Sequence, residues 1–267
     1  MFSCRLPILL AAFLLPLAMN APAAEPQITT EPITYRIGDQ SFEGCVSRPV
    51  KLDGKVPGVL VAHDWTGFGP FVRERAEQLA KLGYVALALD MYGQGIHAKN
   101  PEEAGKLAAP FYKDPALFRT RAQAAFETLL KQPGVDPERI GAIGFCFGGA
   151  TVLELARSGA DVDAVVTFHG SLKTARPAVP GEVKAKEILV LHGANDPLVP
   201  PADVDGFKQE MESAKVPYQF IAYPGAVHAF TNPEAGNDPS KPTAYNPQAA
   251  EAAYGEMRSL FEHEFKR

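Results

Sequence analysis

The sequence predicts an α/β protein built on a doubly wound, mostly parallel β-sheet with an N-terminal antiparallel hairpin at one edge. Apolar runs of strand length alternate along the chain with longer segments of helical period. The runs are nearly continuous in Val, Ile, Leu and Ala, which is typical of strands covered by helices on both faces. Before them, residues 33–37 and 41–47 alternate apolar and polar side chains around a turn-like Gly38-Asp39-Gln40, a pattern that favours a hairpin.

The expected strands and helices follow one another regularly after this hairpin. We expect strands at residues 58–63, 84–90, 139–145, 164–169, 188–192 and 218–223. We expect helices at residues 71–82, in a region ending near 132, and at 147–158, 203–214 and 247–265. In a sheet of this kind, binding and catalytic residues gather where the strands end. Short polar segments occupy those positions in this sequence, so candidate functional residues are sought there.

The first 23 residues differ from the rest of the chain and are expected to be a signal peptide. Arg5 supplies a positive charge, residues 6–18 are mostly apolar, and Ala21 and Ala23 fit an A-x-A cleavage site. The apolar stretch is shorter than the roughly 20 residues that span a bilayer and is broken by prolines, so we expect no stable membrane anchor. The sequence therefore predicts a periplasmic or secreted protein whose mature part, residues 24–267, forms one domain.

Composition argues against several classes of partner and cofactor. The 267 residues carry a formal net charge of −5 and contain no cluster of Lys and Arg of the kind that binds a phosphate backbone. Nucleic acid is therefore not an expected partner. The histidines and carboxylates do not fall into metal-ligand spacings, and no dinucleotide fingerprint is complete, so we expect neither a metal nor another cofactor. The sequence leaves open whether the protein is a monomer or a dimer.

A cysteine lies at the junction between an expected buried strand and an expected helix. The segment GFCFGG at residues 144–149 has the form of the G-x-S-x-G nucleophile elbow, with the sulfur of Cys146 in place of a hydroxyl. Small flanking residues are needed because neighbouring chain passes close to such a sharp turn. This motif alone is equally compatible with a buried cysteine in a tight junction. Cys45, within a strand-like run, is interpreted as a buried apolar residue.

Two later loops supply the partners that such a nucleophile needs. In a hydrolase with this elbow, the acid and then the histidine follow the nucleophile, each after a later strand. Asp196 follows the strand expected at 188–192, and His228 follows the strand expected at 218–223. We therefore predict a triad in which His228 accepts the proton of Cys146 and Asp196 orients the histidine. Asp196 has an alternative role as the cap of the following helix.

The other histidines and the last long loop have less specific patterns. His63 and His169 lie at expected strand ends and are candidates to face the cleft, whereas His97 and His263 are expected on the surface. The loop at residues 225–245 is rich in Pro, Asn and Gly. It could edge the entrance of the site, but we favour its interpretation as a solvated connection.

With these motifs in order, the chain resembles the dienelactone hydrolase family of the α/β-hydrolase superfamily over its whole mature part. The resemblance rests on the elbow at 144–149, the segment HGAND at 192–196 and the turn that presents His228. It implies an α/β-hydrolase fold and an esterase that cleaves an ester-type bond without a cofactor. It also implies that Asp64 corresponds to an acidic residue, usually glutamate, that contacts the resting thiol.

An oxyanion hole is expected from two backbone amides. One belongs to Phe147, directly after the nucleophile, and the other to Trp65, directly after the loop acid Asp64. Asp64 has an alternative role as a loop residue that bonds nearby backbone amides. The side chains of Trp65 and Phe145 either wall the substrate pocket or belong to the core.

Archetypal members of the family grip a substrate carboxylate with two arginines, and this sequence has neither. The matching positions hold Gln94 and Asn232, whose uncharged side chains cannot form a bidentate ion pair with a carboxylate. We therefore expect a small uncharged ester, thioester or lactone as substrate rather than dienelactone itself. Two alternatives remain open: a non-catalytic periplasmic binding protein on the same fold, and a cysteine-dependent acyltransferase or peptidase.

Overall fold

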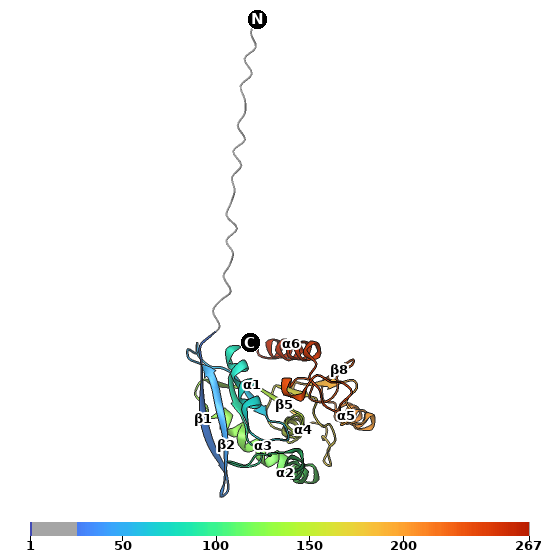
Figure 1. Cartoon of the computed structure of the whole chain (residues 1–267). Helices are drawn as coiled ribbons and strands as arrows, with labels where there is room; N and C mark the ends of the chain where they lie inside the picture. Colours follow the sequence, from blue (N-terminus) through green and yellow to red (C-terminus); the bar gives the residue numbers. More distant parts are fainter. Residues whose placement is uncertain (2–25, 267) are drawn as a thin grey trace.

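A computed structural model describes Met1 and residues 26–266, and it contains one mixed eight-stranded sheet with helices on both faces (Figure 1). The strands are β1 (Ile28–Ile37), β2 (Gln40–Pro49), β3 (Val56–Ala62), β4 (Val85–Ala88), β5 (Val135–Phe145), β6 (Ala164–Phe168), β7 (Glu187–Gly193) and β8 (Tyr218–Tyr223). The helices are α1 (Pro70–Lys81), α2 (Pro101–Lys113), α3 (Pro115–Leu130), α4 (Phe147–Arg157), α5 (Pro201–Ala214), the short 3₁₀ helix η1 (Pro233–Ala235) and α6 (Pro247–Glu264). Apart from Met1, the predicted signal peptide lies outside the described residues.

The strand order confirms the predicted doubly wound sheet with a hairpin at one edge. The order is β1-β2-β4-β3-β5-β6-β7-β8. The first two pairings, β1 with β2 and β2 with β4, are antiparallel, and the five others are parallel. The hairpin strands are each ten residues long and extend beyond the expected ranges. Most of β1 is exposed or half-buried, so its outer half shows no apolar periodicity in the sequence.

The expected helical region that ends near residue 132 consists of two helices. Asp114 follows the last residue of α2 and is also the N-cap of α3, where its side chain accepts a hydrogen bond from the Ala116 backbone N–H. Pro115 is the first residue of α3 and has no N–H with which to continue the preceding helix. The chain therefore changes direction between the two helices.

Two apolar clusters, one on each face, hold the sheet between its helices. Buried residues of α3, α4 and α5 pack on one face, and those of α1 and α6 pack on the other. Figure 1 shows this arrangement, with β5 between α6 and α4. Several strands are apolar on both sides, as predicted, because each side chain faces one of the two clusters.

Parallel register brings the ends of the central strands to one edge of the sheet. The last residue of β3, Ala62, pairs with Gly144, and the last residue of β5, Phe145, pairs with Phe168 at the end of β6. The loops that follow these strands therefore begin side by side. This edge is where the sequence placed the candidate residues.

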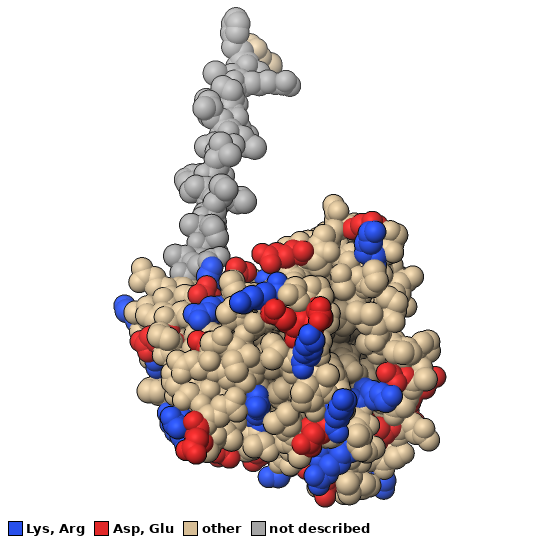
Figure 2. Space-filling model, turned by 60° about the horizontal axis from the view of Figure 1, so that its bottom comes forward, with Lys and Arg blue, Asp and Glu red and all other residues tan. Residues whose placement is uncertain are grey.

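The charged side chains on the face shown in Figure 2 include both signs, with acidic and basic groups intermixed. Among the residues that the structure describes, none of the helices combines the length and the apolar character needed to cross a bilayer.

Candidate active site

The elbow after β5 presents Cys146 at the first turn of α4. Cys146 has φ 53° and ψ −113°, a left-handed conformation that is rare for a residue other than glycine. Its backbone N–H donates to the carbonyl of Phe168 at 3.1 Å. The flanking glycines are required sterically, because a Cβ on Gly144 would lie 1.9 Å from the carbonyl oxygen of Gly148, and one on Gly148 would lie 2.2 Å from that of Ala62. The strained turn predicted from the motif is therefore present.

The loops after β7 and β8 bring Asp196 and His228 into contact. Oδ2 of Asp196 accepts a hydrogen bond from Nδ1 of His228 at 2.8 Å, and both side chains are buried. The other carboxylate oxygen, Oδ1, accepts from the backbone N–H of Leu198 at 2.8 Å. The N-cap of α5 is Pro200, so the alternative role of Asp196 as the cap of that helix is not what the structure shows.

His228 and Cys146 line the same cavity, which has a volume of about 340 Å³. Nε2 of His228 has no hydrogen-bond partner among the described residues. Burial alone would lower the pKa of His228, but the neighbouring Cys146 sulfur and the Asp196 carboxylate raise it to about 10. The structure thus brings together the three residues of the predicted triad, and their catalytic roles remain a prediction.

The walls of this cavity come from loops at the carboxyl ends of the strands and from the first turn of α1. The residues that line it besides Cys146 and His228 are Asp64, Trp65, Thr66, Phe71, Phe145, His169, Leu198, Ala229, Asn232, Glu234, Ala235 and Thr243. Trp65 and Phe145, left open between core and pocket by the sequence, both line the cavity. Leu198, which is 55% exposed, is a wall residue that no motif indicated.

The loop at residues 225–245 forms one wall of the cavity, and its interpretation as a solvated connection was wrong. The N–H of Ala244 donates to the carbonyl of His228 at 3.1 Å, and Thr243 pairs with His228 in an isolated β-bridge. These bonds fold the loop back onto the turn that carries the histidine. Pro, Asn and Gly in this loop form turns whose direction the composition does not reveal.

The two amides expected to form an oxyanion hole are free to donate. Neither the N–H of Trp65 nor that of Phe147 bonds to an acceptor in the described part of the chain. The hydroxyl of Tyr92 donates to the carbonyl of Trp65 at 2.9 Å and so fixes the peptide group between Trp65 and Thr66. Gly148 allows the start of α4 to approach the end of β3, from which the Trp65 loop departs. The arrangement is compatible with the predicted hole, which stays a prediction.

His63 anchors the loop that carries Asp64 and Trp65. The N–H of Met91 donates to its Nε2 at 3.0 Å, so that nitrogen is unprotonated, and Nδ1–H donates to the carbonyl of Asp64 at 2.5 Å. Burial lowers the pKa of His63, which favours this neutral form. Its ring stacks on Phe147 at 5.9 Å. Because both nitrogens have partners, His63 holds the loop, and it also lines a cavity of about 330 Å³ beside this one.

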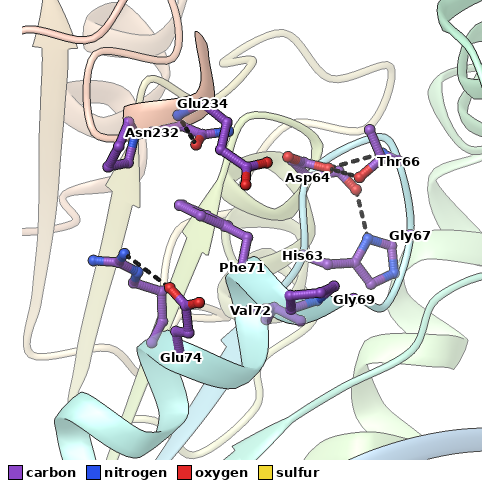
Figure 3. A pocket seen from close by; sticks show the side chains of 13 residues that line it. His63, Asp64, Thr66, Gly67, Gly69, Phe71, Val72, Glu74, Asn232 and Glu234 are labelled. Atoms are coloured by element: carbon purple, nitrogen blue, oxygen red, sulfur yellow. Dashed lines mark hydrogen bonds and ion pairs between the residues drawn. The ribbon is translucent and has the colours of Figure 1, made fainter. Parts of the chain in front are cut away.

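Asp64 lines the cavity beside Cys146, but its hydrogen bonds are local. Its Oδ1 accepts from the backbone N–H of Thr66 at 2.8 Å and from the Thr66 hydroxyl at 2.5 Å (Figure 3). The alternative in which Asp64 bonds nearby loop groups is therefore present in the structure. Contact between its carboxylate and the resting thiol remains a prediction.

His169 lines the cavity of Cys146, in agreement with its expected place at the cleft. It is 2% exposed, has φ 41°, and its ring lies 5.1 Å from that of His228. Nε2 lies 2.8 Å from the hydroxyl oxygen of Thr231, whereas Nδ1 has no partner among the described residues. Burial and, to a smaller extent, the positive charge of His228 hold the pKa of His169 well below its usual value. His97 and His263 are exposed, as predicted.

A second cavity of about 330 Å³ adjoins the first and shares several of its residues (Figure 3). The shared residues are Asp64, Thr66, Phe71, Asn232 and Glu234. Glu234 was not identified from the sequence, because it belongs to the loop taken for a solvated connection. Gln94, at the other position where the archetypal enzymes have arginine, is exposed and lines neither cavity. In the described residues no group of three or more His, Cys, Asp or Glu side chains is arranged to hold a metal ion.

Comparison with protein families and curated sequences gives a consistent result. The model of the dienelactone hydrolase family matches residues 42–265. A Synechocystis protein provisionally named carboxymethylenebutenolidase is 29% identical over 253 residues, which cover 90% of this chain and 98% of that protein. A Bradyrhizobium protein provisionally named 2-oxo-3-(5-oxofuran-2-ylidene)propanoate lactonase is 30% identical over 219 residues, covering 78% of this chain and 84% of the relative.

Two solved structures are similar over nearly their full length. The structure named m3DLH is 40% identical, with a TM-score of 0.85, and the match covers 90% of this chain and 99% of that one. A dienelactone hydrolase-like promiscuous phosphotriesterase from metagenomic libraries is 37% identical, with a TM-score of 0.82 and the same coverage. The predicted fold is therefore found in solved proteins of similar sequence.

Proposed function

The chain belongs to the dienelactone hydrolase family, and on that premise we propose that it hydrolyses an ester-type bond with Cys146 as nucleophile. The observation that carries the proposal is the 2.8 Å hydrogen bond between Nδ1 of His228 and Oδ2 of Asp196, at a cavity that Cys146 also lines. This bond leaves Nε2 of His228 as the nitrogen that can exchange a proton with the thiol.

In the proposed reaction, His228 relays two protons in turn, first that of the thiol and later one from water. Nε2 takes the thiol proton, and the sulfur of Cys146 attacks the substrate carbonyl carbon to form a tetrahedral intermediate. The N–H groups of Trp65 and Phe147 donate to the oxyanion. When the intermediate collapses, the bond to the leaving alcohol or thiol breaks, and the leaving group takes the proton from Nε2. Water, deprotonated by the same nitrogen, then attacks the thioester. The second intermediate releases the carboxylic acid, and the departing sulfur of Cys146 takes the proton back from Nε2.

The lining of the cavity favours a small substrate without a carboxylate. Trp65, Phe71, Phe145 and Leu198 give the cavity an apolar wall, and Asn232 lies where the archetypal enzymes place an arginine. The names of the relatives support esters and lactones as the substrate class. The 37% identity with a promiscuous phosphotriesterase favours a second candidate activity, cleavage of uncharged phosphotriesters at the same thiol.

A substrate panel tests the proposal against its two alternatives. The mature protein from Ala24 onward is assayed with p-nitrophenyl esters of rising acyl length, a neutral lactone and a p-nitrophenyl phosphotriester. Turnover of at least one carboxylic ester or lactone, with water as acceptor, is the expected result. If added amines divert the acyl group at low concentration, the acyltransferase alternative is correct instead. The absence of turnover on every substrate would favour the binding protein.

The pH dependence of the reaction is expected to reflect the high pKa of His228. Burial opposes protonation, but Cys146 and Asp196 raise the pKa of His228 to about 10, so the imidazole keeps its proton to higher pH than usual. The protonated ring, which donates to the leaving group, is therefore lost only as the pH passes about 10. In a pH-stat assay with an alkyl ester, kcat/KM should fall on the alkaline side near this value. Asp196→Asn should move the alkaline decrease of kcat/KM to lower pH. If the decrease stays at the same pH in this variant, its assignment to His228 is wrong.

We further propose that the chain is exported and acts in the periplasm or outside the cell. The pattern of residues 1–23 supports this proposal. When the full chain is expressed in a Gram-negative host, the protein in the periplasmic fraction should begin near Ala24. Recovery only from the cytoplasm, with Met1 or the rest of the leader retained, would argue against export.

A further inference from the structure

Two carboxylates from different loops face the space beside the thiol. Asp64 follows β3, whereas Glu234 belongs to η1 in the loop after β8, and both line both cavities. In Figure 3 the side chain of Glu234 extends toward Asp64, with the ring of Phe71 beside them. The cavity that holds Cys146 therefore has negative charge on two of its sides.

No Lys or Arg side chain pairs with either of these carboxylates within the described part of the chain. Neither Asp64 nor Glu234 has an ion-pair partner there, and Arg75 is the one Lys or Arg side chain that lines either cavity. His228, which lines the cavity of Cys146, is paired with Asp196 instead. The guanidinium of Arg75 donates to Gln78 and to the hydroxyl of Tyr254, and it lies 3.8 Å from the carboxylate of Glu74. Arg75 and Glu74 thus offset each other, which leaves the charges of Asp64 and Glu234 uncompensated.

A second observation, independent of the carboxylates, points to this space as a place where a ligand binds. In the described part of the chain, Nδ1 of His169 has no hydrogen-bond partner, although the side chain is more than nine-tenths buried. His169 lines the cavity that Asp64 and Glu234 also line. Buried polar atoms without partners are rare in native proteins and are commonly satisfied by a bound molecule or by water.

We infer that the ester cleaved at Cys146 carries a positively charged group, which binds between Asp64 and Glu234. The inference rests on the proposed ester hydrolysis and adds the chemical class of the substrate. A quaternary ammonium group suits the site, because Trp65 is 38% exposed at the cavity and such cations bind over aromatic rings. A quaternary ammonium has no N–H to donate, so it can bind beside Asp64 while the hydrogen bonds from Thr66 to Asp64 are kept.

The negative charges of Asp64 and Glu234 explain why an arginine at position 232, as in archetypal members of the family, would not serve this site. A guanidinium beside Glu234 and Asp64 would form ion pairs with these carboxylates. It would then fill the space that a substrate carboxylate needs and would not be available to bind that carboxylate. With Asn232 there instead, the carboxylates stay available to a cationic substrate. Because Glu234 is exposed, its attraction is screened by water and salt, so the expected preference is moderate, about tenfold in kcat/KM.

Pairs of substrates that differ only in charge test the inference. Butyrylthiocholine is compared with 3,3-dimethylbutyl thiobutyrate, which replaces the ammonium nitrogen by carbon on the leaving-group side. The p-nitrophenyl ester of 4-(trimethylammonio)butanoic acid is compared with that of 5,5-dimethylhexanoic acid, which makes the same change on the acyl side. Protein purified after expression of the full chain is used. In at least one pair, kcat/KM should be about tenfold higher for the cation at low salt, with a smaller ratio at 1 M salt.

A variant with a matched control assigns the preference to Glu234. Glu234→Gln keeps the shape and removes the charge, so the cation-to-neutral ratio should fall about threefold. Glu256→Gln, on an exposed site of α6 beside the amino-terminal ends of β7 and β8, should leave the ratio as in the wild type. Circular dichroism spectra verify that both variants are folded.

The outcomes separate this inference from the proposed function. Turnover of the neutral esters with a cation-to-neutral ratio of one or less in both pairs would overturn the inference while ester hydrolysis stands. A preference that survives Glu234→Gln unchanged would also overturn it, because the charge would then act from elsewhere. If neither the neutral nor the cationic esters are cleaved, the proposed function itself fails, and the inference fails with it.

Discussion

Cys146→Ala is expected to lower kcat for a p-nitrophenyl ester by at least about a thousandfold, the scale seen when the nucleophile of a triad is removed. Without the sulfur, no covalent intermediate forms, and His228 has only water to activate. Cys146 lies at the surface of the cavity and is half-buried, so the loss of its sulfur should cost little folding stability. Steady-state kinetics and thermal melts of the two proteins measure both effects.

Cys45→Ala is the matched control for this prediction. Cys45 is the other free cysteine of the described residues, and it is fully buried in the cluster beneath α1 and α6. Its replacement should keep kcat within about twofold and lower the free energy of unfolding by about 1 kcal/mol, because a small cavity is left. If activity persists in Cys146→Ala, or disappears in Cys45→Ala without unfolding, the assignment of the nucleophile is wrong.

Gly148→Ala is expected to reduce both stability and activity. The new Cβ would lie 2.2 Å from the carbonyl oxygen of Ala62 and 2.5 Å from that of His63, and both are backbone atoms that cannot move aside cheaply. Overpacking of this kind costs about 1–3 kcal/mol. Separation of α4 from the end of β3 would also displace the Phe147 and Trp65 amides, for which a loss of about a hundredfold in kcat is expected. Chemical denaturation and ester kinetics measure the two effects.

Gly105→Ala is the control for the same chemical change in an open position. Gly105 lies within α2, and apart from its chain neighbours and the adjacent backbone of the helix, no heavy atom lies within 4 Å of the place that its Cβ would take. Alanine favours helix over glycine by about 1 kcal/mol, so this variant should be as stable as the wild type or more so, with unchanged kcat. A Gly148→Ala protein with wild-type stability and kcat would show that the close approach of α4 to β3 is not needed.

The sequence allowed the strands, the helices and the elbow to be predicted because each has a local physical signature. The apolar run of β6 is buried on both sides, and the run before Cys146 ends at a glycine-flanked turn that only a strand-to-helix junction requires. Asp196 and His228 were found because each follows the end of a buried strand. In a parallel sheet, sequence order alone then places these ends at one edge.

The features that local patterns did not reveal depend on contacts between distant segments. The loop at 225–245 folds back through the bond from Ala244 to His228, and Glu234 reaches the cavity only because of that fold. His63 lines the second cavity, but its role as an anchor of the loop was not visible, because the Met91 N–H that occupies one ring nitrogen lies 28 residues away along the chain. The sequence indicated an acid at position 64, and its bonds to Thr66 became visible only in the structure.

The central claim, that Cys146 carries the acyl group of the substrate, is tested most directly by mass spectrometry of the enzyme during turnover. The protein is mixed with a slowly hydrolysed p-nitrophenyl ester, quenched in acid within the first turnovers and digested with a protease. We expect the peptide that contains Cys146 to gain the mass of the acyl group, and the peptide that contains Cys45 to remain unmodified. An acyl group on another residue, or ester turnover with no adduct on Cys146 under conditions where the release of p-nitrophenol shows a burst, would contradict the claim.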